Sequence, residues 1–358
     1  MTIVDAIAEP LPRAVIDLAA LRRNVAHLAA VAAPAEVMLA VKADAYGHGL
    51  LPVAEAGLEA GATSLAVLEV QAGLVLRRAG VTAPILAWLH GQDTDWRGAI
   101  ENDIELGISA VWQLEVIAAA GADRPAVIHL KVDTGLSRNG ATRADWPGLI
   151  DTALALQERG VVRVRAAWSH LADASLEEDK RALAEFHDAV AEAEARGARF
   201  EILHLAASSA GIRMPEARFD LVRFGIAAYG FSPFDDATGA ELGLVPVMRL
   251  EAPVTEVHVD GTTHVRLAIG FGDGVPTLGI AKASVQLAGR RCPVVDVEAD
   301  ALIVDAGPAR VRVGDVAVLF GPGDGGEVTA EKWADWAETI ADEMITGVAA
   351  RVPRVYIG

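Results

Sequence analysis

The sequence predicts an α/β chain in which a (β/α)8 barrel of the TIM type, residues 1–245, precedes a mostly β C-terminal domain, residues 246–358. Short apolar runs alternate with helix-like stretches through the first two thirds of the chain. After Pro246 the pattern changes to Val- and Thr-rich runs separated by Gly and Asp. A length of 358 residues accommodates both units. An open, doubly wound parallel sheet is the competing architecture for the first part.

The first predicted element is a helix, because Leu18, Leu21, Val25, Leu28 and Val31 recur at helical spacing. The strand candidates that follow are almost continuously apolar, as parallel strands covered on both faces are. Eight such strands, most of them followed by a helix-like stretch, indicate a closed parallel barrel. They cover residues 37–41, 64–68, 85–89, 104–108, 126–132, 161–168, 200–205 and 219–226.

The C-terminal part is expected to begin near residues 243–246 and to contain short strands. A single helix is predicted over residues 329–345, with Thr329 as its N-cap and Lys332 where a capping-box acid would stand. The predicted strands cover residues 254–259, 265–269, 284–287, 301–304, 311–319 and 351–356.

Composition limits the partners of the chain. The net charge of −18, from 31 basic and 49 acidic residues, argues against nucleic acid or an anionic membrane surface as a partner. No apolar run reaches membrane-spanning length. The one cysteine, Cys292, rules out an intrachain disulfide, and no Cys/His spacing suggests a metal site. Met1–Pro10 lacks the basic start of a signal peptide, so we expect a cytoplasmic protein.

The stretch 40–49 is the most informative part of the sequence. Lys42 follows the apolar run 37–41, and Tyr46 lies in a turn with Gly47 and Gly49. Burial disfavours the ammonium form and makes an amine nucleophilic, which a Schiff-base enzyme requires. The simpler alternative is a surface lysine just beyond a strand.

Other polar residues follow the predicted strands at the barrel end where function collects. Arg223 lies in an apolar run, where an unpartnered charge is costly. Arg138 could instead be a solvated loop charge, and His170 a hydrogen-bonded core histidine. A serine and backbone N–H groups after the last two strands suit a phosphate. These residues are Lys131, Asp133, Arg138, His170, Ser208, Arg223 and Gly225. An amine, a phosphate site and an arginine for a ring nitrogen together fit pyridoxal 5'-phosphate.

The sequence resembles the alanine racemase family, fold type III of the pyridoxal-phosphate enzymes. The lysine motif is highly specific, the others moderately so, and together they span nearly the whole chain. The motifs lie at residues 41–49, 131–140, 169–170, 204–210, 219–226 and 351–356.

The resemblance implies a role for each motif residue. Lys42 would hold the cofactor and then act as the base on one face of Cα, and Arg223 would bond the pyridine nitrogen. Arg138 would approach the cofactor's phenolic oxygen and the substrate carboxylate, steadied by Lys131, which is often carbamylated in the family. His170 would lie beside the ring, and Trp88 would contact the cofactor. The implied phosphate ligands are Tyr46, Ser208, Gly225, Ile226 and Tyr356.

The chain departs from the family where the second catalytic base is expected. That base is a tyrosine of the C-terminal domain, donated across a dimer interface. This chain has no tyrosine between Pro246 and Val355, and Phe271 stands at a family tyrosine position. The family's Cys-Met-Asp turn reads Glu298-Ala299-Asp300, which puts a negative charge near the expected substrate carboxylate.

Three functions therefore remain open. The first is a homodimeric amino-acid racemase acting on a small amino acid, with its second base replaced by His258, His264 or Glu298. The second is a one-faced lyase, aldolase or transferase acting on a D-configured β-hydroxy amino acid. The third is a non-catalytic protein that retains the cofactor.

Overall fold

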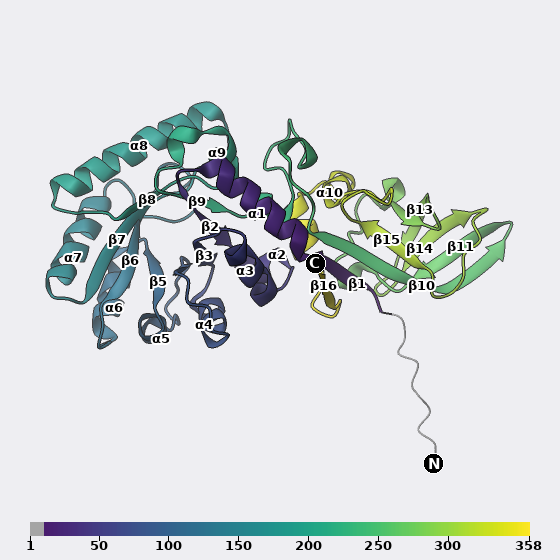
Figure 1. Ribbon diagram of the computed structural model, residues 1–358, viewed down its shortest axis with the longest axis horizontal. Coiled ribbons are helices and arrows are strands. Elements are labelled where there is room, and N and C mark those ends of the chain that lie inside the picture. Colours follow the sequence, from purple (N-terminus) through teal and green to yellow (C-terminus); the bar gives the residue numbers. More distant parts are fainter. Residues whose placement is uncertain (1–10) are drawn as a thin grey trace, which may run out of the picture.

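The computed structural model describes residues 11–358, which form a barrel and an elongated β domain joined end to end (Figure 1). The expectation for Met1–Pro10 lies outside the described residues. Among residues 11–358, no helix has both the length and the apolar character that a membrane crossing requires.

The barrel contains eight parallel strands in the order β8-β7-β6-β5-β4-β3-β2-β9. Backbone hydrogen bonds from Asp220 N to Leu203 O (3.1 Å) and from Arg223 N to Ala206 O (3.1 Å) close it between β8 and β9. The closed barrel is therefore confirmed, and the open sheet is excluded. The strands are β2 (Glu36–Ala40), β3 (Ser64–Val67), β4 (Ile85–Ala87), β5 (Ile104–Ile108), β6 (Ala126–Lys131), β7 (Val162–Trp168), β8 (Ile202–His204) and β9 (Leu221–Phe224).

Helices surround the barrel, as Figure 1 shows. The first of them confirms the predicted periodicity: Leu21, Val25 and Leu28 are buried, and Asp17 Oδ1 caps the helix by accepting from Ala20 N at 2.9 Å. The helices are α1 (Leu18–Ala32), α2 (Lys42–Tyr46), α3 (Leu50–Glu59), α4 (Val70–Arg78), α5 (Trp96–Glu101), α6 (Val111–Ala119), α7 (Trp146–Glu158), α8 (Leu176–Ala195) and α9 (Ser208–Arg213), with 3₁₀ turns η1 (Pro215–Ala217), η2 (Ile226–Tyr229) and η3 (Ala240–Leu242).

The second sheet has the strand order β11-β14-β13-β12-β15-β10-β1-β16. It includes β1, the first strand of the chain, which pairs antiparallel with β10 and parallel with β16. The pattern analysis did not predict β1 or β13, and the division of the chain at residues 245 and 246 stays a proposal. The strands are β1 (Arg13–Asp17), β10 (Met248–Asp260), β11 (Thr262–Leu267), β12 (Ser284–Leu287), β13 (Arg290–Val297), β14 (Leu302–Gly307), β15 (Val316–Phe320) and β16 (Arg354–Ile357), with 3₁₀ turns η4 (Phe271–Asp273) and η5 (Ile280–Lys282).

The single helix predicted over residues 329–345 is wrong. Thr329 is its N-cap as expected, since Oγ1 accepts from Lys332 N at 3.3 Å. Glu338, however, adopts a left-handed conformation with φ 55° and ends the helix. The segment therefore forms α10 (Ala330–Ala337) and α11 (Ala341–Thr346), and α11 packs against α2 of the barrel.

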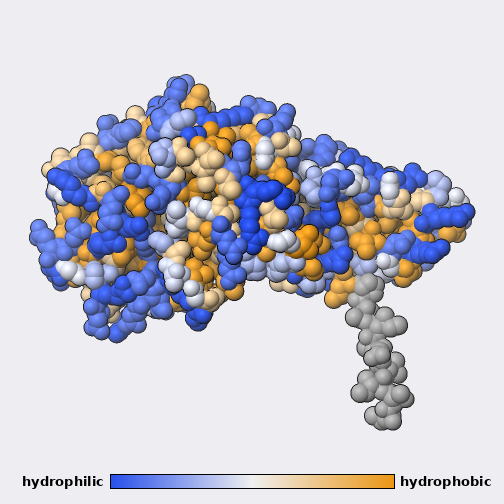
Figure 2. Space-filling view, viewed as in Figure 1, coloured by the Kyte–Doolittle hydropathy of each residue, from blue (hydrophilic) through white to orange (hydrophobic). Residues whose placement is uncertain are grey.

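On the face that Figure 2 shows, hydrophilic residues cover much of the surface, with apolar patches between them. The large apolar side chains exposed on the β domain include Val259, Phe271 and Leu278.

Candidate cofactor site at the barrel mouth

A cavity of about 510 Å³ opens at the C-terminal ends of the barrel strands. It brings together all but one of the residues that the sequence assigned to the cofactor. Those that line it are Lys42, Tyr46, Trp88, Lys131, Arg138, His170, Ser208, Arg223, Gly225 and Ile226.

Lys42 and Tyr46 reach this cavity from α2, which follows β2 after one connecting residue. The α2 backbone is left-handed: φ is 51° at Ala43, 53° at Asp44, 55° at Ala45 and 52° at Tyr46. A left-handed residue other than glycine costs about 1–2 kcal/mol, so this turn stores strain at the site.

The strained turn is held by its own hydrogen bonds. Asp44 Oδ1 accepts from Leu50 N at 2.7 Å, and Ala43 O accepts from Gly47 N at 2.9 Å.

The Lys42 Nζ lies 5.2 Å from the centre of the Tyr46 ring. Burial lowers the pKa of Lys42, Asp342 opposes that shift, and Arg138 adds to it. The environment therefore favours a nucleophilic amine.

Arg223 is fixed by five hydrogen bonds from its guanidinium. It donates to the carbonyls of Ser169 (2.9 Å), His204 (3.2 Å) and Leu205 (3.0 Å). It also donates to His204 Nδ1 at 3.0 Å and to His170 Nδ1 at 3.1 Å. Burial lowers its pKa, and Arg138 lowers it further, yet a guanidinium stays protonated at neutral pH. Its position is therefore rigid and its charge permanent.

The bonds from Arg223 set the tautomers of a buried histidine chain. A guanidinium only donates, so Nδ1 of His204 accepts and its Nε2 carries the proton. That Nε2 lies 2.9 Å from His129 Nδ1, and His129 Nε2 lies 2.8 Å from Glu105 Oε2. Arg165 is ion-paired with the same glutamate. A polar chain thus runs from Arg223 through the barrel interior to Glu105.

His170 is a neutral ring beside Arg223. Burial lowers its pKa to about 2, and Arg223, Arg138, Lys131 and Lys42 contribute. Because its Nδ1 accepts from Arg223, its proton is on Nε2.

A cradle for an anion lies between α9 and η2. Ser208 Oγ accepts from Gly225 N at 3.2 Å and from Ala227 N at 3.4 Å. A Cβ at position 225 would collide with the Tyr46 hydroxyl, so only glycine leaves this cradle open. Burial raises the pKa of Tyr46, with a further contribution from Asp342, so its hydroxyl remains a donor. Neutral donors around a small-residue cradle fit a phosphate.

The same cavity is also lined by basic side chains. Lys131 is buried, with its Nζ 4.6 Å from the centre of the Trp168 ring. Burial, Arg223 and Arg138 lower its pKa to about 7, and Asp133 opposes the shift. Arg138 is exposed on a loop shaped by Asp133 Oδ1, which accepts from Gly135 N (3.1 Å) and Ser137 N (3.0 Å). The acidic protein therefore has a basic pocket suited to a small anion.

Tyr356 is the exception among the predicted phosphate ligands. It is 39 % exposed on β16, does not line the cavity formed by residues 11–358, and its hydroxyl lies against Gly49. Its assignment to the phosphate is not supported by this position.

The other candidates of the C-terminal domain also lie away from this chain's own cavity. Arg266 binds Glu298 at 2.6 Å and Asp300 at 3.1 Å. His258 is exposed and lies 3.0 Å from Glu256, and it pairs in register with His264 across β10 and β11. Their roles toward a partner subunit stay predictions.

Pattern analysis missed several residues that line the cavity, among them Asp342 and Trp168. Asp342 reaches it from α11, and the ring of Trp168 lies below Lys131 and Arg223. The predicted continuous helix gave no reason to bring Asp342 to the barrel. Trp168 was visible only as the end of an apolar strand.

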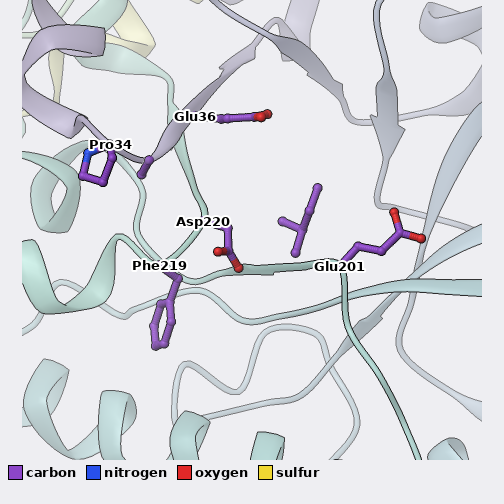
Figure 3. A pocket seen from close by; sticks show the side chains of 7 residues that line it. Pro34, Glu36, Glu201, Phe219 and Asp220 are labelled. Carbon is purple, nitrogen blue, oxygen red and sulfur yellow. The ribbon is translucent and has the colours of Figure 1, made fainter.

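A second cavity, of about 320 Å³, lies at the opposite end of the barrel (Figure 3). Three of its lining residues are acidic, and each has a partner: Glu36 accepts from Thr63 (3.0 Å), Asp220 from Leu203 N (2.7 Å), and Glu201 pairs with Arg163. Its lining contains no basic residue, so it does not suit an anionic cofactor.

The mouth of the barrel holds an amine on a strained turn, a neutral cradle for a phosphate and a fixed arginine. Together with a (β/α)8 barrel followed by a C-terminal β domain, these features define a fold type III pyridoxal-phosphate enzyme. The family models for the alanine racemase N-terminal and C-terminal domains match residues 16–233 and 253–356. The chain belongs to the alanine racemase family, an isomerase family that uses pyridoxal 5'-phosphate, which confirms the predicted resemblance, fold class and cofactor.

Relatives match over nearly the full length. The alanine racemase of Beutenbergia cavernae is 42% identical, covering 97% of this chain and 98% of its own. That of Thermobifida fusca is 43% identical, with 96% and 97% covered. The crystal structure of alanine racemase from Streptomyces lavendulae superposes with a TM-score of 0.94 at 39% identity, covering 98% of each chain.

Proposed function

We propose that this chain racemises a small amino acid, with alanine as the first candidate, and that Lys42 is the base on one face of Cα. The observation that carries the proposal is the convergence of the Lys42 amine, the Tyr46–Ser208–Gly225 cradle and the fixed Arg223 on one cavity. The relatives named alanine racemase support the choice of substrate.

Pyridoxal 5'-phosphate, when bound, supplies an aldehyde for Lys42 and a conjugated ring that withdraws electrons from Cα. Arg223 can only donate, so it would keep the pyridine nitrogen unprotonated and moderate the ring as an electron sink. The Tyr46 and Ser208 groups, with the backbone at Gly225 and Ile226, would hold the phosphate. His170 and Trp88 would border the ring.

Arg138 is the group we assign to the substrate carboxylate. It is exposed at the mouth of the cavity, where an incoming amino acid would meet it. Lys131 would steady it from the cavity wall. Carbamylation of Lys131, implied by the family resemblance, would convert a mutual repulsion into an attraction, and its lowered pKa favours the neutral amine that this modification requires.

We propose a homodimer, because the opposite face of Cα needs a second acid or base. Within residues 11–358, the candidates His258, His264 and Glu298 do not line their own chain's cavity. A partner subunit would therefore have to present one of them. A cytoplasmic location is consistent with the single cysteine, Cys292, which is buried and free.

The second candidate function is a one-faced reaction, such as aldehyde release from a D-configured β-hydroxy amino acid. It is favoured by one feature: the region that would supply the tyrosine base contains none, and Phe271 occupies one family tyrosine position. Without an opposing base, proton transfer at a single face would dominate.

Exchange with solvent distinguishes these functions. The cofactor-loaded protein is incubated in D₂O with L-alanine and separately with D-alanine, and deuterium at Cα is followed by NMR, with Lys42→Ala as control. Racemisation predicts deuterium entry from both enantiomers and formation of the opposite one. Entry from one enantiomer only would support the one-faced reaction. No exchange and no aldehyde from a β-hydroxy panel, with cofactor absorbance retained, would indicate a non-catalytic protein.

A further inference from the structure

Among the residues that the structure describes, Asp342 is the one cavity-lining residue that follows residue 245. It lies on α11, which is fixed against the left-handed turn of α2. A Cβ at Gly47 would lie 2.5 Å from Ile345 O, and Arg354 Nε donates to Gly47 O at 2.8 Å. Asp342 therefore faces the cavity from a rigid position.

The Asp342 carboxylate is half-buried, and few interactions offset the cost of removing its charge from water. Within residues 11–358 it forms no ion pair. Burial raises its pKa, and the charge of Lys42, followed by a hydrogen bond from the backbone of Asp342 itself, opposes that shift. In turn, Asp342 raises the pKa of both Lys42 and Tyr46, which shows that its charge is felt at both side chains.

The same region is where the cofactor phosphate would bind. Tyr46 belongs to the cradle, and its hydroxyl lies against Gly225, beside the Ser208 hydroxyl that bonds Gly225 N. The cradle offers neutral donors and no lysine or arginine of its own. A carboxylate facing this cradle repels a phosphate dianion across a partly dehydrated space, where Coulomb interactions are stronger than in water.

We propose that Asp342 weakens the hold of this chain on the cofactor phosphate, so that the cofactor is bound reversibly and exchanges with the free pool. This inference rests on the proposed cofactor site. Its signature is a difference between two ligands: Asp342 should weaken the binding of pyridoxal 5'-phosphate far more than that of pyridoxal, which carries the same aldehyde and ring without the phosphate.

The test titrates the cofactor-free, full-length protein with pyridoxal 5'-phosphate and with pyridoxal, following the visible absorbance of the bound form. Asp342→Asn is compared with the unmutated chain and with Glu343→Gln, which removes the adjacent exposed carboxylate of the same helix. We expect Asp342→Asn to bind pyridoxal 5'-phosphate roughly tenfold more tightly. Its affinity for pyridoxal, which Asp342 can affect only through Lys42, should change far less, and both affinities of Glu343→Gln should stay unchanged.

The two ligands separate the possible failures. Equal affinities of Asp342→Asn and the unmutated chain for pyridoxal 5'-phosphate would overturn the role of Asp342 while leaving the cofactor site intact. A parallel change for both ligands would also overturn it, because the effect would then act through Lys42 or the fold. If neither ligand gave absorbance that depends on Lys42, the cofactor assignment would fall together with this inference. Pyridoxal binding also reports that Asp342→Asn is folded.

Discussion

Arg223 and Lys131 are both buried cations, but their surroundings give them different chemistry. Five acceptors surround the guanidinium of Arg223, and each bond is charge-assisted, so its burial is compensated. Lys131 has the Trp168 ring below its amine and two arginines near it. The first residue is therefore a fixed charge, whereas the second is poised to lose its proton near neutral pH.

The lowered pKa of Lys131 gives a stability prediction with a definite sign. Its pKa falls from 10.5 in the unfolded chain to about 7 in the fold, so the unfolded chain binds more protons between these values and folding stability rises with pH across that window. Lys131→Met removes this effect. In carbon dioxide-free buffer the variant should be more stable at pH 7 by on the order of 1–3 kcal/mol, with the difference shrinking toward pH 10.

Urea unfolding at a series of pH values measures this difference. Lys180→Met, at an exposed position on α8, is the matched control and should track the unmutated protein. A constant difference between Lys131→Met and the unmutated chain across the pH range would contradict the lowered pKa.

Sequence reasoning found those side chains whose chemistry conflicts with their local pattern. Lys42 follows an apolar strand, and Arg223 lies within one. An unpartnered charge is energetically costly in such a place, so the sequence pattern identified both residues as functional candidates. Asp342 lies on a surface-type helix with no such conflict. Its place in the cavity depends on the left-handed Glu338, and glutamate gives no local signal for that conformation.

Elements were predicted where periodicity is strong and missed where tertiary pairing decides. All eight barrel strands were located because their apolar runs are buried on both faces. The α2 turn could not be foreseen, since the alanines at 43 and 45 ordinarily avoid the left-handed region. Likewise, β1 is a strand because β10 and β16 flank it, and its five residues alone carry too little pattern.

The junction of α2 with η2 predicts that Gly225→Ala damages cofactor binding. Its Cβ would collide with the Tyr46 hydroxyl, and the strained α2 backbone leaves Tyr46 little freedom to withdraw. We expect affinity for pyridoxal 5'-phosphate to fall by roughly tenfold or more, with pyridoxal less affected. Titration by absorbance measures both. The control is Gly148→Ala on α7, where open space surrounds the new methyl group, and it should change neither affinity. Undiminished binding of pyridoxal 5'-phosphate by Gly225→Ala would show that the phosphate does not lie in the cradle.

At the scale of the whole molecule, the barrel and the β domain are tied together at several points. The chain begins in the second sheet with β1, enters the barrel at α1, and returns through β10, while α11 reaches back to α2. These ties fix the β domain relative to the barrel mouth of its own chain. They bring Asp342 to that cavity but leave Glu298 and His258 away from it, which is why we propose that a second copy of the chain supplies the second base.

A second copy should cover Phe271, which leads to a prediction about self-association. Phe271 is 51 % exposed on η4, and that turn is anchored because buried Asp273 binds Arg351 Nη2 at 2.5 Å. Phe271→Glu would place a charge in an apolar contact and should weaken the dimer at least roughly tenfold. Sedimentation velocity over a concentration series measures this, with Val75→Glu on α4, 43 % exposed, as the control on the outer barrel. Deuterium exchange should fall together with the dimer, while cofactor absorbance at Lys42 persists, because in the proposed homodimer one chain would supply the cofactor cavity and two would complete the reaction site. A dimer that survives Phe271→Glu unchanged would place the interface elsewhere, and a monomer that still racemises both enantiomers would assign the second base to the same chain.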